Sequence, residues 1–262
     1  MRVYSGADCM NDLESFTKIF SSAVRMLGGN PAGGMLQLPS GAVAGASGVP
    51  FAGENYVMFT EESSEEDILA VLDFFNIKGL PFVIPLLPFL SGRFRSFLAS
   101  RGFEVRSRYN AMSISTERRE NPRDDADIEI FSDEQRDEWG EVAWVGFGGK
   151  LPVPFEFHDM INYFSRCESN SLFSLRLNGH IICTGLLHHN DGMCWLDYFA
   201  TLPEFRHMGL AERFMEFLLW QTSRFADTLF LLSTEMGFPM YRHQGFISLA
   251  DVPMLSLSRD VD

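Results

Sequence analysis

Residues 195–219 read WLDYFATLPEFRHMGLAERFMEFLL, and they form the junction around which the rest of the chain is organised. The aromatic and apolar side chains of Trp195–Thr201 predict a strand that ends before Pro203. Leu210–Leu219 repeats apolar residues with the period of an amphipathic helix. A strand that enters a helix through a short loop brings free backbone N–H groups and the positive end of the helix dipole to one place. Such a place is suited to bind a pyrophosphate.

The loop at this junction supplies the residues that we expect to bind the phosphates. Gly209 and Ala211 have little or no side chain, so phosphate oxygens can approach the backbone donors closely. Arg206 can add a forked, charge-assisted hydrogen bond that a lysine would not reproduce. His207 contributes through its backbone N–H rather than through its imidazole. The complete predicted binding segment is Arg206, His207, Met208, Gly209, Leu210 and Ala211.

The pattern P-x-x-R-x-x-G-x-A between a strand and a helix resembles the acyl-coenzyme A signature of the GCN5-related N-acetyltransferase (GNAT) superfamily. Two later segments extend the resemblance. Leu229–Thr234 is a short apolar run that suits the next strand, and Tyr241–Phe246 is similar to the family's Y-x-x-x-G-F element. A strand, an Arg-Gly loop, a helix, a second strand and the Tyr-x-x-x-Gly-Phe element, in this order, are more specific than the loop motif alone.

This resemblance implies a fold of the α/β class and α+β type, in which a mixed, mostly antiparallel sheet is flanked by helices. It implies transfer of an acetyl group from acetyl-CoA to a primary amine by direct attack. It also implies that the central strand separates from Leu229–Thr234. Main-chain groups of Phe199, Ala200 and Thr201 would then contact the thioester end of the coenzyme.

Attack of a neutral amine on a thioester needs a proton acceptor, oxyanion donors and an acid for the leaving thiolate. Tyr241 matches the family's tyrosine, so its phenol would protonate the sulfur of coenzyme A. The alternative is that the Tyr241 ring packs in the core with its hydroxyl satisfied locally.

Several residues are candidates for the general base. Asp197 is a carboxylate in an apolar strand, where desolvation would raise its pKa toward a useful range. The alternative for Asp197 is a hydrogen-bonded structural role. Glu156, His158 and Glu235 are further candidates, and His188 and His189 are expected to be turn residues.

A short internal repeat indicates two tandem copies of one α/β unit. Leu98–Phe103 is followed after a gap by Ala111–Ser115, and Tyr241–Phe246 is followed after a similar gap by Pro253–Ser258. The charged run 116–127 is the best candidate linker. We therefore predict a degenerate GNAT-like domain over residues 1–120 and an acyltransferase domain over residues 127–262.

The two halves differ where a coenzyme would bind. In place of the Arg206–Ala211 loop, the first half has Thr60–Asp67, in which Ser63 or Ser64 can cap a helix through a capping box. Its carboxylates would repel a pyrophosphate and already complement the positive end of the helix. We therefore expect no coenzyme site in the first half.

Periodicity and turn signals predict the remaining elements. Helices are expected over residues 12–27, 65–76, 94–100, 133–145 and 157–166. Strands are expected over 35–38, 42–45, 56–60, 82–87, 128–131, 172–177, 180–188 and 193–201, with a strand pair between 101 and 115. Asn178-Gly179 predicts a hairpin turn, because both residues accept positive φ.

Composition restricts the possible partners. A formal net charge of −14 argues against nucleic acid, because its binding relies on clustered Lys and Arg. The charge permits a cationic acceptor such as a polyamine, an aminoglycoside or a peptide N-terminus, although it also serves solubility. The four cysteines lack metal-ligand spacing and are expected to be buried thiols in a reducing compartment.

The sequence shows neither a leader peptide nor a spanning segment, so we expect a cytoplasmic protein without membrane or metal. The expected partner is a small-molecule or peptide amine, and the chain can be a monomer or a homodimer. Two alternatives to an enzyme are a non-catalytic acyl-CoA-binding sensor and a purely structural or interaction protein. The Arg206–Ala211 loop is common to the first two hypotheses, and Tyr241 favours the enzyme.

Overall fold

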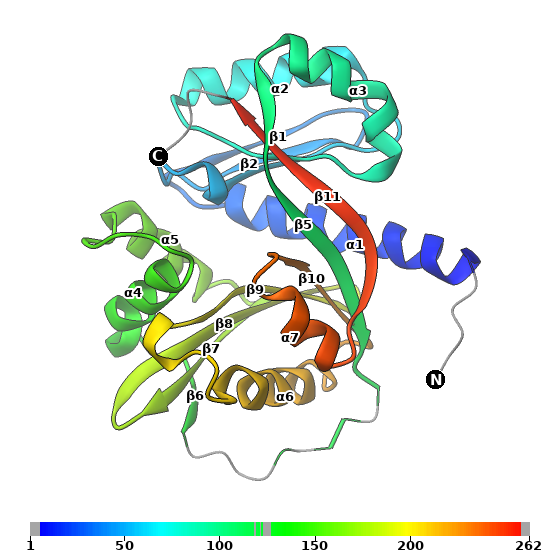
Figure 1. Cartoon of the computed structure of the whole chain (residues 1–262). Coiled ribbons are helices and arrows are strands. Elements are labelled where there is room, and N and C mark those ends of the chain that lie inside the picture. The colour runs from blue at the N-terminus through cyan, green and yellow to red at the C-terminus, as the bar shows by residue number, and fades with distance from the viewer. Residues whose placement is uncertain (1–5, 118, 121, 123–126, 258–262) are drawn as a thin grey trace. The chain divides into compact units, whose positions relative to one another are not determined.

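The computed structural model describes residues 6–117, 119–120, 122 and 127–257. The fold is mixed α+β, and its sheets are rich in antiparallel pairs (Figure 1). Contacts divide the chain into two compact units. The first unit contains the chain up to Met112, Leu232–Pro239 and the segment from Ser248 onward, and the second contains Ser113–Leu231 and Met240–Ile247.

The first unit contains a small antiparallel sheet and three helices. Its helices are α1 (Gly6–Gly28), α2 (Glu65–Lys78) and α3 (Pro88–Ser100). Its strands are β1 (Gly34–Gln37), β2 (Val43–Ala46), β3 (Asn55–Met58) and β4 (Ile84–Pro85), with most of β5 (Phe103–Ser115) and β11 (Ile247–Leu257). A 3-10 turn, η1 (Ala52–Glu54), precedes β3.

Strand pairing within the first unit joins a segment near the end of the chain to segments from its first half. β1, β2 and β3 are antiparallel neighbours, and β3 has a parallel bridge to the chain near β4, between Tyr56 and Val83. β11 runs antiparallel to β4, with Met254 opposite Pro85. A strand from the end of the chain therefore completes the unit that the first half begins.

The second unit contains the predicted junction. Its strands are β6 (Ile128–Ile130), β7 (Asn170–Leu177), β8 (His180–Asn190), β9 (Met193–Thr201) and the larger part of β10 (Thr228–Ser233). Its helices are α4 (Arg136–Gly146), α5 (Phe155–Phe164), α6 (Leu210–Thr222) and most of α7 (Phe238–His243), with 3-10 turns η2 (Asp133–Gln135) and η3 (Pro203–Phe205).

The strands of the second unit are ordered β10-β9-β8-β7-β6. β6 to β9 are antiparallel neighbours, whereas β10 is parallel to β9. Tyr198 of β9 is buried among the rings of Trp139, Phe157 and Phe164 from α4 and α5, with centroids 5.9 to 6.2 Å away. These contacts hold both helices against the central strand.

Most predicted elements are confirmed within one or two residues at each end. The Asn178-Gly179 turn has φ values of 53° and 85°, as a hairpin turn with positive φ at both positions requires. The predicted capping box of α2 is present, with Ser64 and Asp67 bonded to each other's backbone N–H. Cys183 and Cys194 are buried free thiols, as expected, whereas the free thiol of Cys167 is only partly buried, and the Cys9 side chain lies outside the described part of the structure.

Some predictions were wrong in detail. The strand pair expected between Arg101 and Ser115 is one strand, β5, because no turn interrupts its extended backbone. The helix expected from Phe94 begins at Pro88, since proline is well tolerated in the first helical turn. The helix expected from Asp133 is divided into η2 and α4.

The division predicted at residues 120–127 stays a prediction. The contacts add that Ser248–Leu257, from the second half of the sequence, lies in the first unit, whereas Ser113–Ser115 of β5 lies in the second. In the described part of the chain, no helix is both long and apolar enough to cross a membrane.

Candidate functional site

The central strand β9 contains a bulge that the sequence did not reveal. In the β8–β9 ladder Thr184 is opposite Ala200 and Leu186 is opposite Asp197, so two residues of β9 face Gly185 alone. One of them, Tyr198, has a φ of 47°, which a non-glycine residue rarely adopts outside such features. Thr184 Oγ1 donates a hydrogen bond of 2.9 Å to the Tyr198 carbonyl and holds the bulge.

The two parallel strands β9 and β10 separate before β9 reaches this bulge. β9 and β10 pair at Met193, Cys194 and Trp195, opposite Thr228–Phe230, and the ladder then ends although β9 continues to Thr201. The separation that the family resemblance implied is therefore confirmed. Strand edges without a neighbour can pair with the amides of an extended ligand.

The loop after β9 leads into a helix end that no side chain caps. Gly209 is the N-cap residue of α6, with a φ of 76°, and His207 also has a positive φ, of 61°. A Cβ at Gly209 would meet nothing within 4 Å, so the loop needs glycine there for its backbone conformation. The first-turn N–H groups of α6 are therefore not used by a cap, unlike those of α2, where Ser64 accepts from Asp67.

Arg206 is the loop residue whose position differs most from the sequence-based expectation. Its Nε donates to the Thr201 carbonyl at 3.1 Å, and its Nη2 donates to the Gly146 carbonyl at 2.7 Å. Its backbone N–H donates to the Pro203 carbonyl at 3.3 Å. The guanidinium thus binds protein backbone in this structure, and its role as a pyrophosphate ligand stays a prediction.

Asp197, predicted as the base, lies on β9, and Tyr241, predicted as the acid, lies in α7, where the charge of Asp197 acts on its phenol. Asp197 is partly buried and accepts hydrogen bonds from Trp195 Nε1 at 3.1 Å and from the Tyr198 N–H at 2.8 Å. Burial raises the pKa of Asp197, against the lowering effect of these two donors.

Tyr241 lies in the α7 segment with its ring buried. The ring centroid is 6.0 Å from that of Phe199 and 5.3 Å from that of Phe246. Burial raises the pKa of the Tyr241 phenol above its ordinary value, and the charge of Asp197 raises this pKa further. The phenol therefore keeps its proton across the neutral range, as an acid in the reaction requires.

The predicted main-chain ligands lie at the end of β9. Phe199 stacks on Phe214 of α6, with centroids 5.8 Å apart. Ala200 is buried and pairs with Thr184 across the ladder. The Thr201 carbonyl already accepts from Arg206, and its hydroxyl lies 3.3 Å from Cys183 Sγ.

The other base candidates lie on other elements than β9 and α7. His158 Nδ1 lies 3.8 Å from Asp137 Oδ1, between α5 and α4. Glu156 is in the first turn of α5, and Glu235 is exposed in the first unit. The expectation that His188 and His189 are turn residues was wrong, because both lie within β8 and its ladder with β9.

Buried His188 provides a test of the packing of the second unit. Its Nδ1 lies 2.8 Å from Asn170 Oδ1, and burial lowers its pKa to about 4, with a smaller effect from His189. The unfolded chain, with a pKa of about 6.5, therefore binds this proton first. We expect stability to be complete above pH 6.5 and to fall by about 3 kcal/mol as the pH drops toward 4.

Urea unfolding from neutral pH down to about pH 4.5 measures this loss. His188→Gln should remove this part of the pH dependence, whereas His180→Gln, whose parent side chain is 83% exposed, should leave it unchanged. Equal pH slopes in the wild type and in His188→Gln would contradict the assignment.

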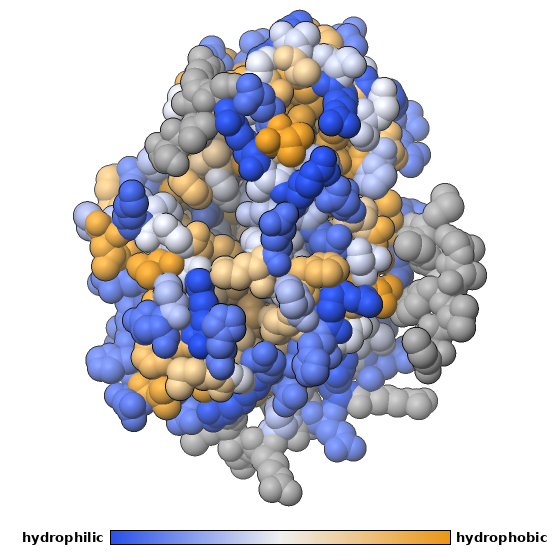
Figure 2. Space-filling view, viewed as in Figure 1, coloured by the Kyte–Doolittle hydropathy of each residue, from blue (hydrophilic) through white to orange (hydrophobic). Residues whose placement is uncertain are grey.

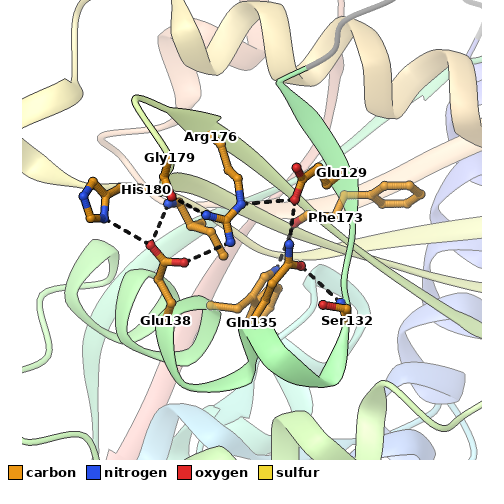
Figure 3. A network of polar contacts seen from close by, with 10 residues as sticks. Glu129, Ser132, Gln135, Glu138, Phe173, Arg176, Gly179 and His180 are labelled. Carbon is orange, nitrogen blue, oxygen red and sulfur yellow. Dashed lines mark hydrogen bonds and ion pairs between the residues drawn. The ribbon is translucent and has the colours of Figure 1, made fainter.

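Figure 3 shows a polar network at the end of the β7–β8 hairpin, which the sequence did not indicate because its members come from separate elements. Arg176 forms ion pairs with Glu129 at 3.1 Å and with Glu138 at 3.0 Å. Gln135 donates to Glu129 at 2.6 Å, and the Ile181 N–H donates to Glu138 at 2.9 Å. Since its carboxylates are matched by donors, the network is a structural connection between β6, α4 and the hairpin.

Comparisons with known proteins agree with this geometry. Residues 129–246 match the sequence model of the Acetyltransferase (GNAT) family. The matched region begins in β6 and ends just after α7, so it contains β9, the loop before α6, and Tyr241. No curated protein matches the chain.

Solved structures share the fold at low sequence identity. A GCN5-related N-acetyltransferase from Kribbella flavida is 13% identical, with a TM-score of 0.64 over 92% of this chain and 95% of that chain. A functionally unknown conserved protein from Staphylococcus epidermidis is 13% identical, with a TM-score of 0.60 over 86% and 94%. A GCN5-related N-acetyltransferase from Sphaerobacter thermophilus is 14% identical, with a TM-score of 0.55 over 84% and 78%.

Proposed function

We propose that residues 127–262 transfer an acetyl group from acetyl-CoA to a primary amine of a small molecule or peptide. The observation that carries the proposal is the course of β9, which parts from β10 and then enters a helix whose N-terminus has no side-chain cap. This course lies within the region that matches the GNAT family.

The coenzyme would be held mainly by backbone groups. The N–H groups of residues 207–211, at a helix N-terminus, suit the pyrophosphate, and the positive φ at Gly209 supports a glycine there. The main chain of Phe199, Ala200 and Thr201 would contact the thioester end, along the part of β9 beyond its ladder with β10.

Two side chains of the protein would then carry out the two proton transfers of the reaction. Asp197, whose pKa is raised by burial, is a candidate to accept the ammonium proton, directly or through water. Tyr241, whose phenol stays protonated at neutral pH, would donate to the leaving thiolate. The charge of Asp197 acts on the Tyr241 phenol and raises its pKa, which supports a shared site.

We also propose that residues 1–120 are a degenerate copy of the same unit. β3, α2, β4, α3 and β5 follow one another in the same order as β9, α6, β10, α7 and β11. In each series the chain after the first helix runs parallel to the first strand. The end of α2, however, is closed by Ser64 and Asp67, which supports a copy without a coenzyme site.

Substitution of Met208 tests the coenzyme site with little disturbance of the fold, because this side chain is 59% exposed. We expect Met208→Glu to weaken binding of coenzyme A and acetyl-CoA by about tenfold or more, since a carboxylate there opposes the phosphates. Met208→Gln has nearly the same size without the charge, and should bind within about threefold of the wild type. Isothermal titration calorimetry on the three full-length proteins gives these affinities.

Three results would count against the proposal. Absence of binding to the folded wild type would exclude the acyltransferase. Equal weakening by glutamate and glutamine would place the phosphates elsewhere. Binding without thiol release across a panel of polyamines, aminoglycosides and peptides would favour the sensor.

A further inference from the structure

We propose that Arg206 is a positioning residue that fastens the C-terminus of α4 to the end of β9, instead of a direct ligand of the pyrophosphate. Its effect would be to fix the start of the loop between α4 and α5, residues 147–154, against the end of β9, where the main chain of Phe199–Thr201 would contact the thioester. The catalytic meaning of this contact rests on the proposed function, but the contact itself does not.

The first observation is that one guanidinium joins two elements that are far apart in the sequence. Gly146 is the last residue of α4 and Thr201 is the last residue of β9, and Arg206 donates to both carbonyls, at 2.7 and 3.1 Å. Carbonyls at the end of a helix lack intrahelical partners and carry the negative end of the dipole. A cation is therefore favourable there, and the planar fork of arginine can reach both acceptors.

The second observation is the close approach of α4 to β9 at the same point. A Cβ on Gly146 would lie 2.6 Å from the Ala200 Cβ and 3.5 Å from the Thr201 nitrogen. The last residue of α4 therefore rests directly on β9, and it must be glycine for this approach. The Arg206 contact and the glycine contact fix the same junction independently.

The third observation concerns the loop that follows. The side chains of Phe147 and Leu151 are exposed, at 56% and 60%. The loop backbone is bound to Trp144 of α4 by two hydrogen bonds. The Gly149 N–H donates to the Trp144 carbonyl, and Trp144 Nε1 donates to the Lys150 carbonyl. Figure 2 shows apolar surface where α4 and α5 lie. The position of this apolar loop thus follows the position of the end of α4.

The proposal separates the charge of Arg206 from its geometry. The carbonyls that it binds are neutral, so its positive charge still favours phosphates in the adjacent loop. Lysine keeps this charge but is a single point donor on a flexible stem, so it cannot reproduce the fork. Arg206→Lys is therefore the informative variant.

Hydrogen exchange measured by mass spectrometry on the full-length protein without ligand tests the contact. We expect the amides of residues 147–149, which form the turn after α4, to exchange at least about tenfold faster in Arg206→Lys than in the wild type. Peptides from the β7–β8 hairpin should not change. Arg213→Lys is the matched control, because Arg213 also lies in this region of the sequence but forms an ion pair with Asp127.

Titration and kinetics then distinguish positioning from direct binding. Arg206→Lys should bind coenzyme A within about threefold of the wild type, because the charge is kept. In thiol release, with the panel amine that reacts fastest, it should raise the acceptor KM by about fivefold or more and leave the acetyl-CoA KM unchanged. A merely structural role would not divide the two KM values in this way.

Unchanged exchange at residues 147–149 in Arg206→Lys would overturn the proposal, as would loss of coenzyme A binding with an unaltered loop. Gly146→Ala, which leaves Arg206 in place, should reproduce the faster exchange if the junction is what positions the loop. Failure of the wild type to bind coenzyme A would refute the proposed function, while the exchange result would still decide the contact.

Discussion

Tyr241→Phe is expected to lower kcat for thiol release from acetyl-CoA by about 100-fold or more, with coenzyme A affinity unchanged. The hydroxyl is the group that would give its proton to the thiolate, and phenylalanine keeps the ring that contacts Phe199 and Phe246. Because burial and the charge of Asp197 both raise the pKa of the phenol, no loss of its proton should limit the rate near neutral pH. Stopped-flow detection of free thiol measures the effect.

Tyr56→Phe is the matched control, because it removes a hydroxyl from β3 in the first half. It should leave kcat within about twofold of the wild type. Full activity in both Tyr241→Phe and Tyr56→Phe would contradict the prediction. Tyr241 would then only pack in the core, and another group would have to protonate the thiolate.

Separating the halves is expected to abolish folding of each. A fragment of residues 123–262 would keep β11 but lose β4, its antiparallel neighbour in the first unit. Val252, Met254 and Leu255 are buried in the intact chain, and exposing them would cost about 1.5 to 3 kcal/mol for each side chain. That loss is comparable with the whole stability of an ordinary domain.

Circular dichroism during heating tests this expectation. Fragments 1–122 and 123–262 should each lack a cooperative transition, whereas the two expressed together should form a soluble complex that unfolds cooperatively. If fragment 123–262 unfolded cooperatively on its own, at the temperature of the full chain, the pairing of β11 with β4 would be dispensable.

Local sequence signals were sufficient for much of the fold. Asn178-Gly179, the Ser64–Asp67 capping box and the apolar period of Leu210–Leu219 each act between residues close in sequence, and each is present as predicted. The separation of β9 from β10 came from the family resemblance, because no single-strand pattern reports where a neighbour ends.

Features that depend on distant partners were not predictable in this way. The bulge at Tyr198 requires the register of β8, and the direction of the Arg206 side chain requires the carbonyl of Gly146. His188 was expected to be a turn residue at the end of its strand, but β8 continues to Asn190, and the ladder partner Trp195 keeps His188 inside the sheet. Likewise, the network of Arg176 joins elements that the sequence keeps well apart.

The capping box of α2 also bears on how each half responds to a ligand. Ser64 and Asp67 supply the acceptors at this helix end within the chain itself, and caps of this kind contribute about 1 kcal/mol at all times. The corresponding end of α6 has no such internal acceptor, so a bound anion would supply that stabilisation only in proportion to its concentration. If the two halves are copies of one unit, as we propose, the first helix end is stabilised at all times and the second only when a ligand is bound.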